Sequence, residues 1–112
     1  MEEFIKYLHS KAEEGKTETA ALLAEGRRDD ANFAKVRTNI YDVCRTVSLA
    51  LVNRPGAGVG AVKAQLERFH TEWSAALEKA RQYGNVNGIA VEEIKLAALD
   101  DVIAHFREVT EA

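Results

Sequence analysis

Glu67 and His70 are the residues whose spacing most directly suggests chemistry. They lie three positions apart, so on a helix both side chains would point to one side and could hold one metal ion. A complete site would need a second such pair, but neither His9 nor His105 has a carboxylate three positions before it. Glu67 also directly follows Leu66, which belongs to an apolar stripe. We therefore expect an exposed, solvated pair and no metal or other cofactor.

The Glu-x-x-His spacing resembles that of di-iron and di-manganese bundles, which use two such pairs and two further glutamates from other helices. The acidic pair Glu13-Glu14 resembles the start of the E-E-x-x-E motif with which all-α nucleotide pyrophosphohydrolases hold magnesium. Thr17 stands where that motif needs its third glutamate, and Asn39 stands where the second motif, E-x-x-D, needs a glutamate before Asp42. Because both motifs are incomplete, we expect no catalytic residues here, and paired acids are ordinary on exposed helix faces.

A glycine-rich segment, residues 56–61, formally matches the pattern G-x-G-x-x-A and leads into a predicted helix. It resembles the dinucleotide-binding fingerprint, which needs a preceding strand so that the glycine turn presents backbone N–H groups to a pyrophosphate. Here the preceding apolar residues continue a helical pattern that begins at Phe33, and a chain this short and this helical leaves no room for the sheet. We predict a flexible glycine loop, with weak anion binding at the start of the following helix as the alternative.

Composition and charge argue against several classes of partner. The chain carries 15 Lys and Arg against 18 Asp and Glu, a formal net charge of -3, with the two signs interleaved. Neither a nucleic-acid-binding surface nor a membrane-surface helix has this pattern. No apolar run approaches the roughly 20 residues of a membrane span, and the N-terminus opens with acids where a signal peptide would carry bases. We expect one cytoplasmic domain, residues 1–112, that binds neither nucleic acid nor membrane.

Apolar residues repeat at helical spacing through most of the chain. Between residues 59 and 83 they step alternately by three and four, which describes one stripe along an α-helix rather than the alternation of a strand. This stripe contains Val59, Val62, Leu66, Phe69, Trp73, Ala76, Ala80 and Tyr83, and we expect Trp73 in the core. A second stripe contains Phe33, Val36, Ile40, Val43, Val47 and Ala50, with Cys44 beside it. Because a buried apolar thiol resists ionisation, we expect Cys44 to be unreactive.

The predicted fold is an all-α, antiparallel, up-down-up-down four-helix bundle, because short connections between long helices favour antiparallel neighbours. The helices are expected at about 2–25, 30–53, 58–83 and 89–110. Gly15 costs about 1 kcal/mol relative to alanine in a helix interior, so we expect a kink or a break of the first helix there. Gly26 predicts the end of that helix, Asp29 or Asp30 a cap for the second, and Asn87 a cap for the fourth.

The fourth helix is apolar over a wider arc than one core-facing stripe needs. Its apolar residues cover roughly 200°, where about 100–140° would suffice. The surplus edge repeats every seven residues, at Ile89, Leu96 and Ile103, and predicts either a wide core position or a subunit interface. The candidate partner-facing surface combines this edge with three residues that lie off the main stripe of their own helix: Tyr41, Leu49 and Val52.

Two functions of different classes fit the sequence. The first is a non-enzymatic bundle that binds another protein or a second copy of itself as a homodimer, and the surplus apolar helix surface favours it. The second is a small enzyme, or a ligand- or metal-binding sensor, with a pocket between its helices. The predicted stripes contain almost no polar or ionisable residues for such a pocket. We therefore favour the interaction module, whose biological role and partner the residues do not identify.

Overall fold

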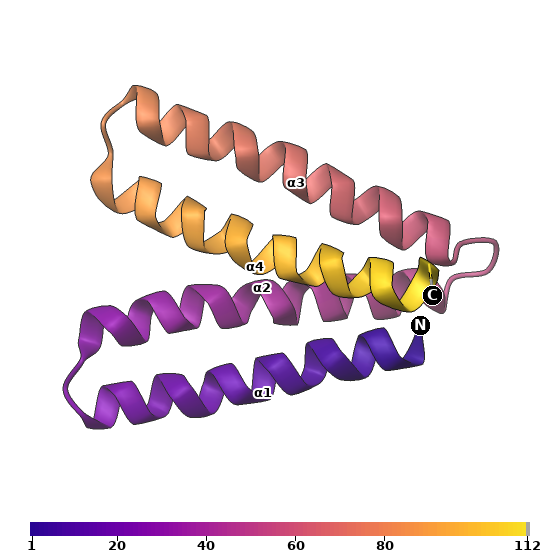
Figure 1. Cartoon of the computed structure of the whole chain (residues 1–112), viewed down its shortest axis with the longest axis horizontal. Coiled ribbons are helices and arrows are strands. Elements are labelled where there is room, and N and C mark those ends of the chain that lie inside the picture. Colours follow the sequence, from indigo (N-terminus) through magenta and orange to yellow (C-terminus); the bar gives the residue numbers. More distant parts are fainter. Residues whose placement is uncertain (112) are drawn as a thin grey trace.

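The computed structural model describes residues 1–111, and these residues form four helices without any strand. The helices are α1 (Glu2–Ala24), α2 (Arg28–Val52), α3 (Val59–Gln82) and α4 (Val86–Glu111). α1 leads away from the end of the molecule at which the N-terminus lies, α2 returns to it, and α3 and α4 repeat this path (Figure 1). The predicted all-α four-helix bundle is therefore confirmed.

α1 ends at a glycine, as the sequence predicts. Gly26 has φ 77°, in the left-handed region that glycine adopts without a steric penalty. Its N–H donates to the carbonyl of Leu23 at 3.0 Å, and the N–H of Arg27 donates to the carbonyl of Leu22 at 2.9 Å. These two bonds satisfy carbonyls at the end of the helix and turn the chain sharply back. α2 can then begin after a connection of only residues 25–27.

Two predicted helix caps are wrong. α2 begins before Asp29 and Asp30, so both acids lie in its first turn, where the positive end of the helix dipole favours them. α4 begins one turn earlier than predicted, because Asn85 rather than Asn87 caps it. The side-chain oxygen of Asn85 accepts the backbone N–H of Gly88 at 3.0 Å.

Gly15 does not break α1, which runs as one helix from Glu2 to Ala24, and the predicted interruption is wrong. The glycine is buried against α2, where a Cβ atom would lie 1.9 Å from Oγ1 of Thr38. Thr38 in turn donates its hydroxyl to the carbonyl of Ala34 at 2.7 Å. The absence of a side chain at Gly15 therefore lets two helices approach closely, and it does not bend the backbone.

The buried core lies at the end of the molecule that holds both termini and the 53–58 loop (Figure 1). It draws on the first half of α1 and α3 and on the second half of α2 and α4: Phe4, Leu8, Ala12, Ile40, Tyr41, Cys44, Val62, Leu66, Ala98, Leu99, Val102 and Phe106. The rings of Phe4 and Phe106 meet edge to face, with centroids 5.4 Å apart, and so join α1 to α4. Trp73 is only half-buried; it packs against this core and stacks on Phe69.

The stripe that α2 buries is not the predicted one. Its buried residues are mostly small or polar: Ala31, Ala34, Thr38, Ile40, Tyr41, Cys44 and Ser48. Of the larger apolar residues in the predicted stripe, only Ile40 is among them. Phe33, Val36 and Val47 are half-buried, and Val43 is 39% exposed. Close packing of α2 on α1 selects small side chains for the contact, which leaves larger apolar groups partly in solvent.

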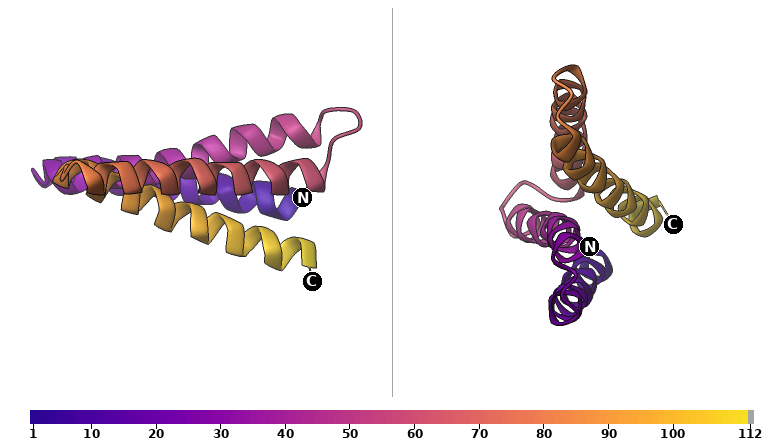
Figure 2. Two further views of the ribbon diagram at one scale, coloured as in Figure 1. Left: turned by 90° about the horizontal axis from the view of Figure 1, so that it is seen from above. Right: turned by 90° about the vertical axis from the view of Figure 1, so that its left-hand side faces the viewer.

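The two helical hairpins, α1/α2 and α3/α4, are joined mainly by α2 and α4 and diverge towards the end with the 25–27 and 83–85 turns (Figure 1). Seen along the molecule, they form two separate layers (Figure 2). The radius of gyration is 15.1 Å, whereas a compact domain of this length has about 13 Å. The solvent-accessible surface is 6871 Å² for 12.4 kDa, about 700 Å² more than a folded monomer of this mass typically exposes. The divergence of the hairpins thus leaves extra surface in water.

Candidate interaction surface

A groove of about 770 Å³ lies between the first half of α3 and the second half of α4. Its apolar lining includes Leu66 and Phe106, two nearly fully buried core residues, together with the half-buried Ile103. Exposed or half-exposed residues form the rest of the lining: Val59, Lys63, Glu67, His70, Thr71, Asp100, Ala104, Arg107, Thr110 and Glu111. The groove therefore opens directly onto the hydrophobic core.

The wide apolar arc of α4 explains why the groove forms beside this helix. One side of the arc, with Leu99, Val102 and Phe106, is buried in the core. The other side carries Ile103, which lies at the groove. Ile89 and Leu96 continue the same edge of α4 at a spacing of seven residues, and both are half-buried.

The structure places the predicted partner-facing residues in different parts of the molecule. Ile103 lines the groove, while Ile89 and Leu96 lie further along the same edge of α4. Leu49 and Val52, near the end of α2, are half-buried, and Val52 packs against the core. Tyr41 is not on the surface, because it is only 5% exposed and its hydroxyl binds another helix. The prediction that Tyr41 faces a partner is therefore wrong.

Charged side chains of both signs surround the groove. Nε2 of His70 lies 3.4 Å from Oδ1 of Asp100, which links α3 to α4 across the groove. Seven residues before His70 on α3 is Lys63, and seven residues after Asp100 on α4 is Arg107. Because α3 and α4 are antiparallel neighbours, Lys63 and Arg107 lie at the same level, about 10 Å along the helices from the His70–Asp100 pair. The signs therefore alternate along the groove, because Glu111 lies one turn beyond Arg107 and Glu67 lies between Lys63 and His70.

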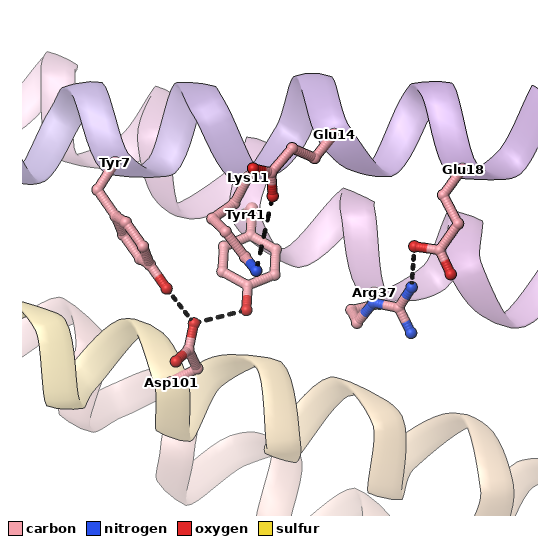
Figure 3. Close-up of polar contacts among 7 residues, drawn as sticks. All are labelled: Tyr7, Lys11, Glu14, Glu18, Arg37, Tyr41 and Asp101. Atoms are coloured by element: carbon pink, nitrogen blue, oxygen red, sulfur yellow. Dashed lines mark hydrogen bonds and ion pairs between the residues drawn. The ribbon is translucent and has the colours of Figure 1, made fainter.

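A second polar cluster joins three helices, and sequence reasoning missed it. Oδ2 of Asp101 on α4 accepts a hydrogen bond from the hydroxyl of Tyr7 on α1 at 2.5 Å and another from Tyr41 on α2 at 2.7 Å (Figure 3). His105 stacks on the Tyr7 ring with centroids 3.4 Å apart, and the Lys11 ammonium lies 5.5 Å from the centre of the Tyr41 ring. Asp101 therefore fastens the α3/α4 hairpin to the α1/α2 hairpin.

The pKa shifts in this cluster follow from its burial and its hydrogen bonds. Burial alone would raise the pKa of Asp101, but the hydrogen bonds from the two phenols outweigh it and lower this pKa below its ordinary value. Burial and the bond to Asp101 raise the pKa of both Tyr7 and Tyr41 above 10.0. A carboxylate that already accepts two hydrogen bonds is a poor general base, and phenols that ionise so reluctantly are poor nucleophiles.

The Glu67–His70 pair that the sequence singles out is not part of a cluster of metal-ligand side chains within residues 1–111. In this range no three His, Cys, Asp or Glu side chains come together as a metal site would require. Glu67 and His70 are both exposed at the groove, as the sequence predicts, and the partner of His70 is Asp100. None of the helices in this range combines the length and the apolar character needed to cross a bilayer.

Cys44 is expected to resist thiol reagents in the native protein. It is 0% exposed, and burial raises the pKa of its thiol to about 12, so almost no thiolate forms at neutral pH. Ellman's reagent added at neutral pH should release its chromophore only after guanidinium unfolds the chain. Complete labelling within seconds without denaturant would contradict the buried position.

The chain has no significant match to a protein family, to a curated protein or to a solved structure.

Proposed function

We propose that this chain works by protein–protein interaction, as a non-enzymatic helical bundle whose partner is another protein chain or a second copy of itself. The observation that carries the proposal is the surplus of accessible surface over that of a compact monomer, about 700 Å². A standard protein–protein interface buries about 800 Å² on each partner. The surplus is thus of the size that one such contact would cover.

Partly exposed apolar groups support this proposal. Val43 and Val47 on α2 line a shallow depression of about 220 Å³, and α4 carries the half-buried edge at Ile89 and Leu96. Covering such groups is favourable by about 25 cal/mol for each Å² of apolar surface removed from water. The carboxylate of Asp101 is engaged in hydrogen bonds that hold the helices together. The partly exposed apolar groups therefore favour a binding function over a catalytic one.

The mass in solution tests the self-association form of this proposal. Sedimentation velocity across about 1 μM to 1 mM should show a concentration-dependent species of twice 12.4 kDa, since weak specific contacts have dissociation constants in this range. Dilution should return the monomer with unchanged helical circular dichroism. A mass of 12.4 kDa at every concentration would contradict self-association.

A ligand-binding function is the second candidate, and the α3/α4 groove is the observation that favours it. Its volume of about 770 Å³ falls within the range of about 300–1,000 Å³ that is common for small-molecule pockets. A thermal-shift screen with nucleotides, combined with metal analysis of the native protein, tests this candidate. A reproducible rise in melting temperature that the groove substitution Ala104→Glu abolishes would favour a sensor over an interaction module.

A further inference from the structure

We propose that the α3/α4 groove binds a helix of another protein, an amphipathic helix whose apolar face lies in the groove and whose flanks carry charges of both signs. This inference rests on the proposed function, because it names the surface and the kind of partner. Amphipathic helices bind grooves between helices through apolar side chains spaced at i, i+3 or i+4, and i+7. The length of the groove, its apolar lining and the order of its charges support this partner.

The groove has the length of a short helix. Its lining residues on α3 extend from Val59 to Thr71, and those on α4 extend from Asp100 to Glu111. At 1.5 Å per residue, each wall is therefore about 16–18 Å long, or about three helical turns. Because neighbouring helices form the two walls (Figure 1), a third helix that lies along the groove can pack its side chains between theirs.

Apolar groups that remain partly in water lie from one end of the groove to its middle. Val59, at one end, is 43% exposed, and the half-buried Ile103 and the exposed Ala104 lie near the middle. The side chains of Lys63 and Arg107 add their aliphatic stems to the two walls. Apolar side chains of a bound helix would remove these groups from water, which is favourable by about 25 cal/mol for each Å².

The charges along the groove alternate in sign at intervals of one helical turn. Glu111 lies one turn from the level of Lys63 and Arg107 in one direction, and Glu67 lies one turn from it in the other. A ligand of a single sign would therefore meet like charges at one of these levels, which costs affinity. A helix can place acids and bases alternately at i, i+4 and i+8, about 6 Å apart, and so match all three levels. The order of charges thus favours a helix of mixed sign over a nucleic acid, a lipid headgroup or another ligand of one sign.

Three synthetic peptides built on one leucine-anchored helix test this partner. Each has about 14 residues, about 21 Å as a helix, and a hydrocarbon staple on its solvent side keeps it helical. They differ only in their flanking charges, which are alternating Lys and Glu, all Lys, or all Glu. In fluorescence anisotropy at about 0.15 M salt, where long-range attraction is screened, we expect the alternating peptide to bind about tenfold more tightly than either of the others. Equal or tighter binding of a single-sign peptide would overturn the proposal.

Substitutions in the protein locate the bound peptide. Ala104→Glu places a bulky charged side chain in the groove, and Ala64→Glu makes the same change at an exposed site of α3 outside it. We expect the first to weaken binding of the alternating peptide about tenfold and the second to leave it unchanged. Lys63→Glu/Arg107→Glu replaces both bases of the groove with acids, so this variant should bind the all-Lys peptide most tightly. All four positions are exposed, so each variant should keep the helicity and melting temperature of the parent chain.

Failure of the groove and failure of the proposed function give different results. If no peptide binds, or if Ala104→Glu leaves binding unchanged, the groove is not a helix-binding site, whereas self-association in the sedimentation experiment would still support an interaction module. A dimer that Ala104→Glu dissociates would assign the groove to a second copy of the chain. A rise in melting temperature with a nucleotide or metal ion, abolished by the same substitution, would assign it to a small ligand. Either assignment would overturn the helix as its occupant.

Discussion

Replacing Asp101 with alanine is expected to lower the free energy of unfolding by about 2–4 kcal/mol, because two phenols lose a charged acceptor and hydrogen bonds to charged groups contribute about 1.5–3 kcal/mol each. Tyr41 is nearly fully buried, so its hydroxyl would have little access to water as a substitute partner. The loss also weakens the only cluster in residues 1–111 in which one side chain bonds to both helices of the other hairpin. Urea unfolding followed by circular dichroism measures the change.

Asp100 supplies a matched control next to Asp101. Its carboxylate is exposed and pairs only with the exposed His70, so Asp100→Ala should change stability by no more than about 0.5 kcal/mol. If the two substitutions had equal effects, the three-helix cluster would contribute nothing to stability. Tyr41→Phe should give an intermediate loss, since Asp101 keeps its bond from Tyr7.

The Asp101 effect should depend on pH in a defined way. The folded pKa of Asp101 lies below its unfolded value of 3.8, so its contribution is complete above pH 3.8 and is lost as pH falls through the folded pKa. The folded pKa values of Tyr7 and Tyr41 lie above 10.0, so their contribution is complete below pH 10 and is lost as pH rises beyond it. The difference between the parent chain and Asp101→Ala should therefore be largest between these limits and shrink on both sides.

The fold was predictable because helical periodicity depends on local sequence alone. The spacing from Val59 to Tyr83 predicts α3 almost to the residue, and Gly26 predicts the end of α1. Which face of a helix is buried depends on its neighbours, and here the prediction for α2 was wrong. The large residues Phe33 and Val36 dominate its apolar pattern, but the helix buries Ala34 and other small residues instead.

The candidate site was predictable only in part. The surplus edge of α4 leads to Ile103, which lines the groove, but the groove also depends on how far α3 and α4 diverge, and no local pattern encodes that distance. From the sequence alone, Asp101 looks like one of two adjacent acids on an exposed helix face. Its partners Tyr7 and Tyr41 lie 94 and 60 residues away, so only the packing of the hairpins brings them together.

Gly15→Ala is expected to lower the free energy of unfolding by about 1–3 kcal/mol, although alanine is the better helix former by about 1 kcal/mol. The added Cβ would lie 1.9 Å from Oγ1, 2.8 Å from Cβ and 2.9 Å from Cγ2 of Thr38, so α1 and α2 must move apart. Overpacking of this kind outweighs the gain in helix propensity. Thermal and urea unfolding both report the loss.

Gly60→Ala measures the gain in helix propensity without the steric clash that Gly15→Ala creates. A Cβ atom added at Gly60, in α3, would have no neighbouring atom within 4 Å. Alanine there should therefore be neutral or stabilising by up to about 1 kcal/mol. The double variant Gly15→Ala/Thr38→Ala should be more stable than the sum of its single changes implies, because removing Oγ1 and Cγ2 of Thr38 relieves part of the clash. If Gly15→Ala instead stabilised the chain as Gly60→Ala does, α1 and α2 could not be in close contact at Gly15. Close packing at Gly15 would then not explain why α2 buries Ala34 and Thr38 in place of Phe33 and Val36.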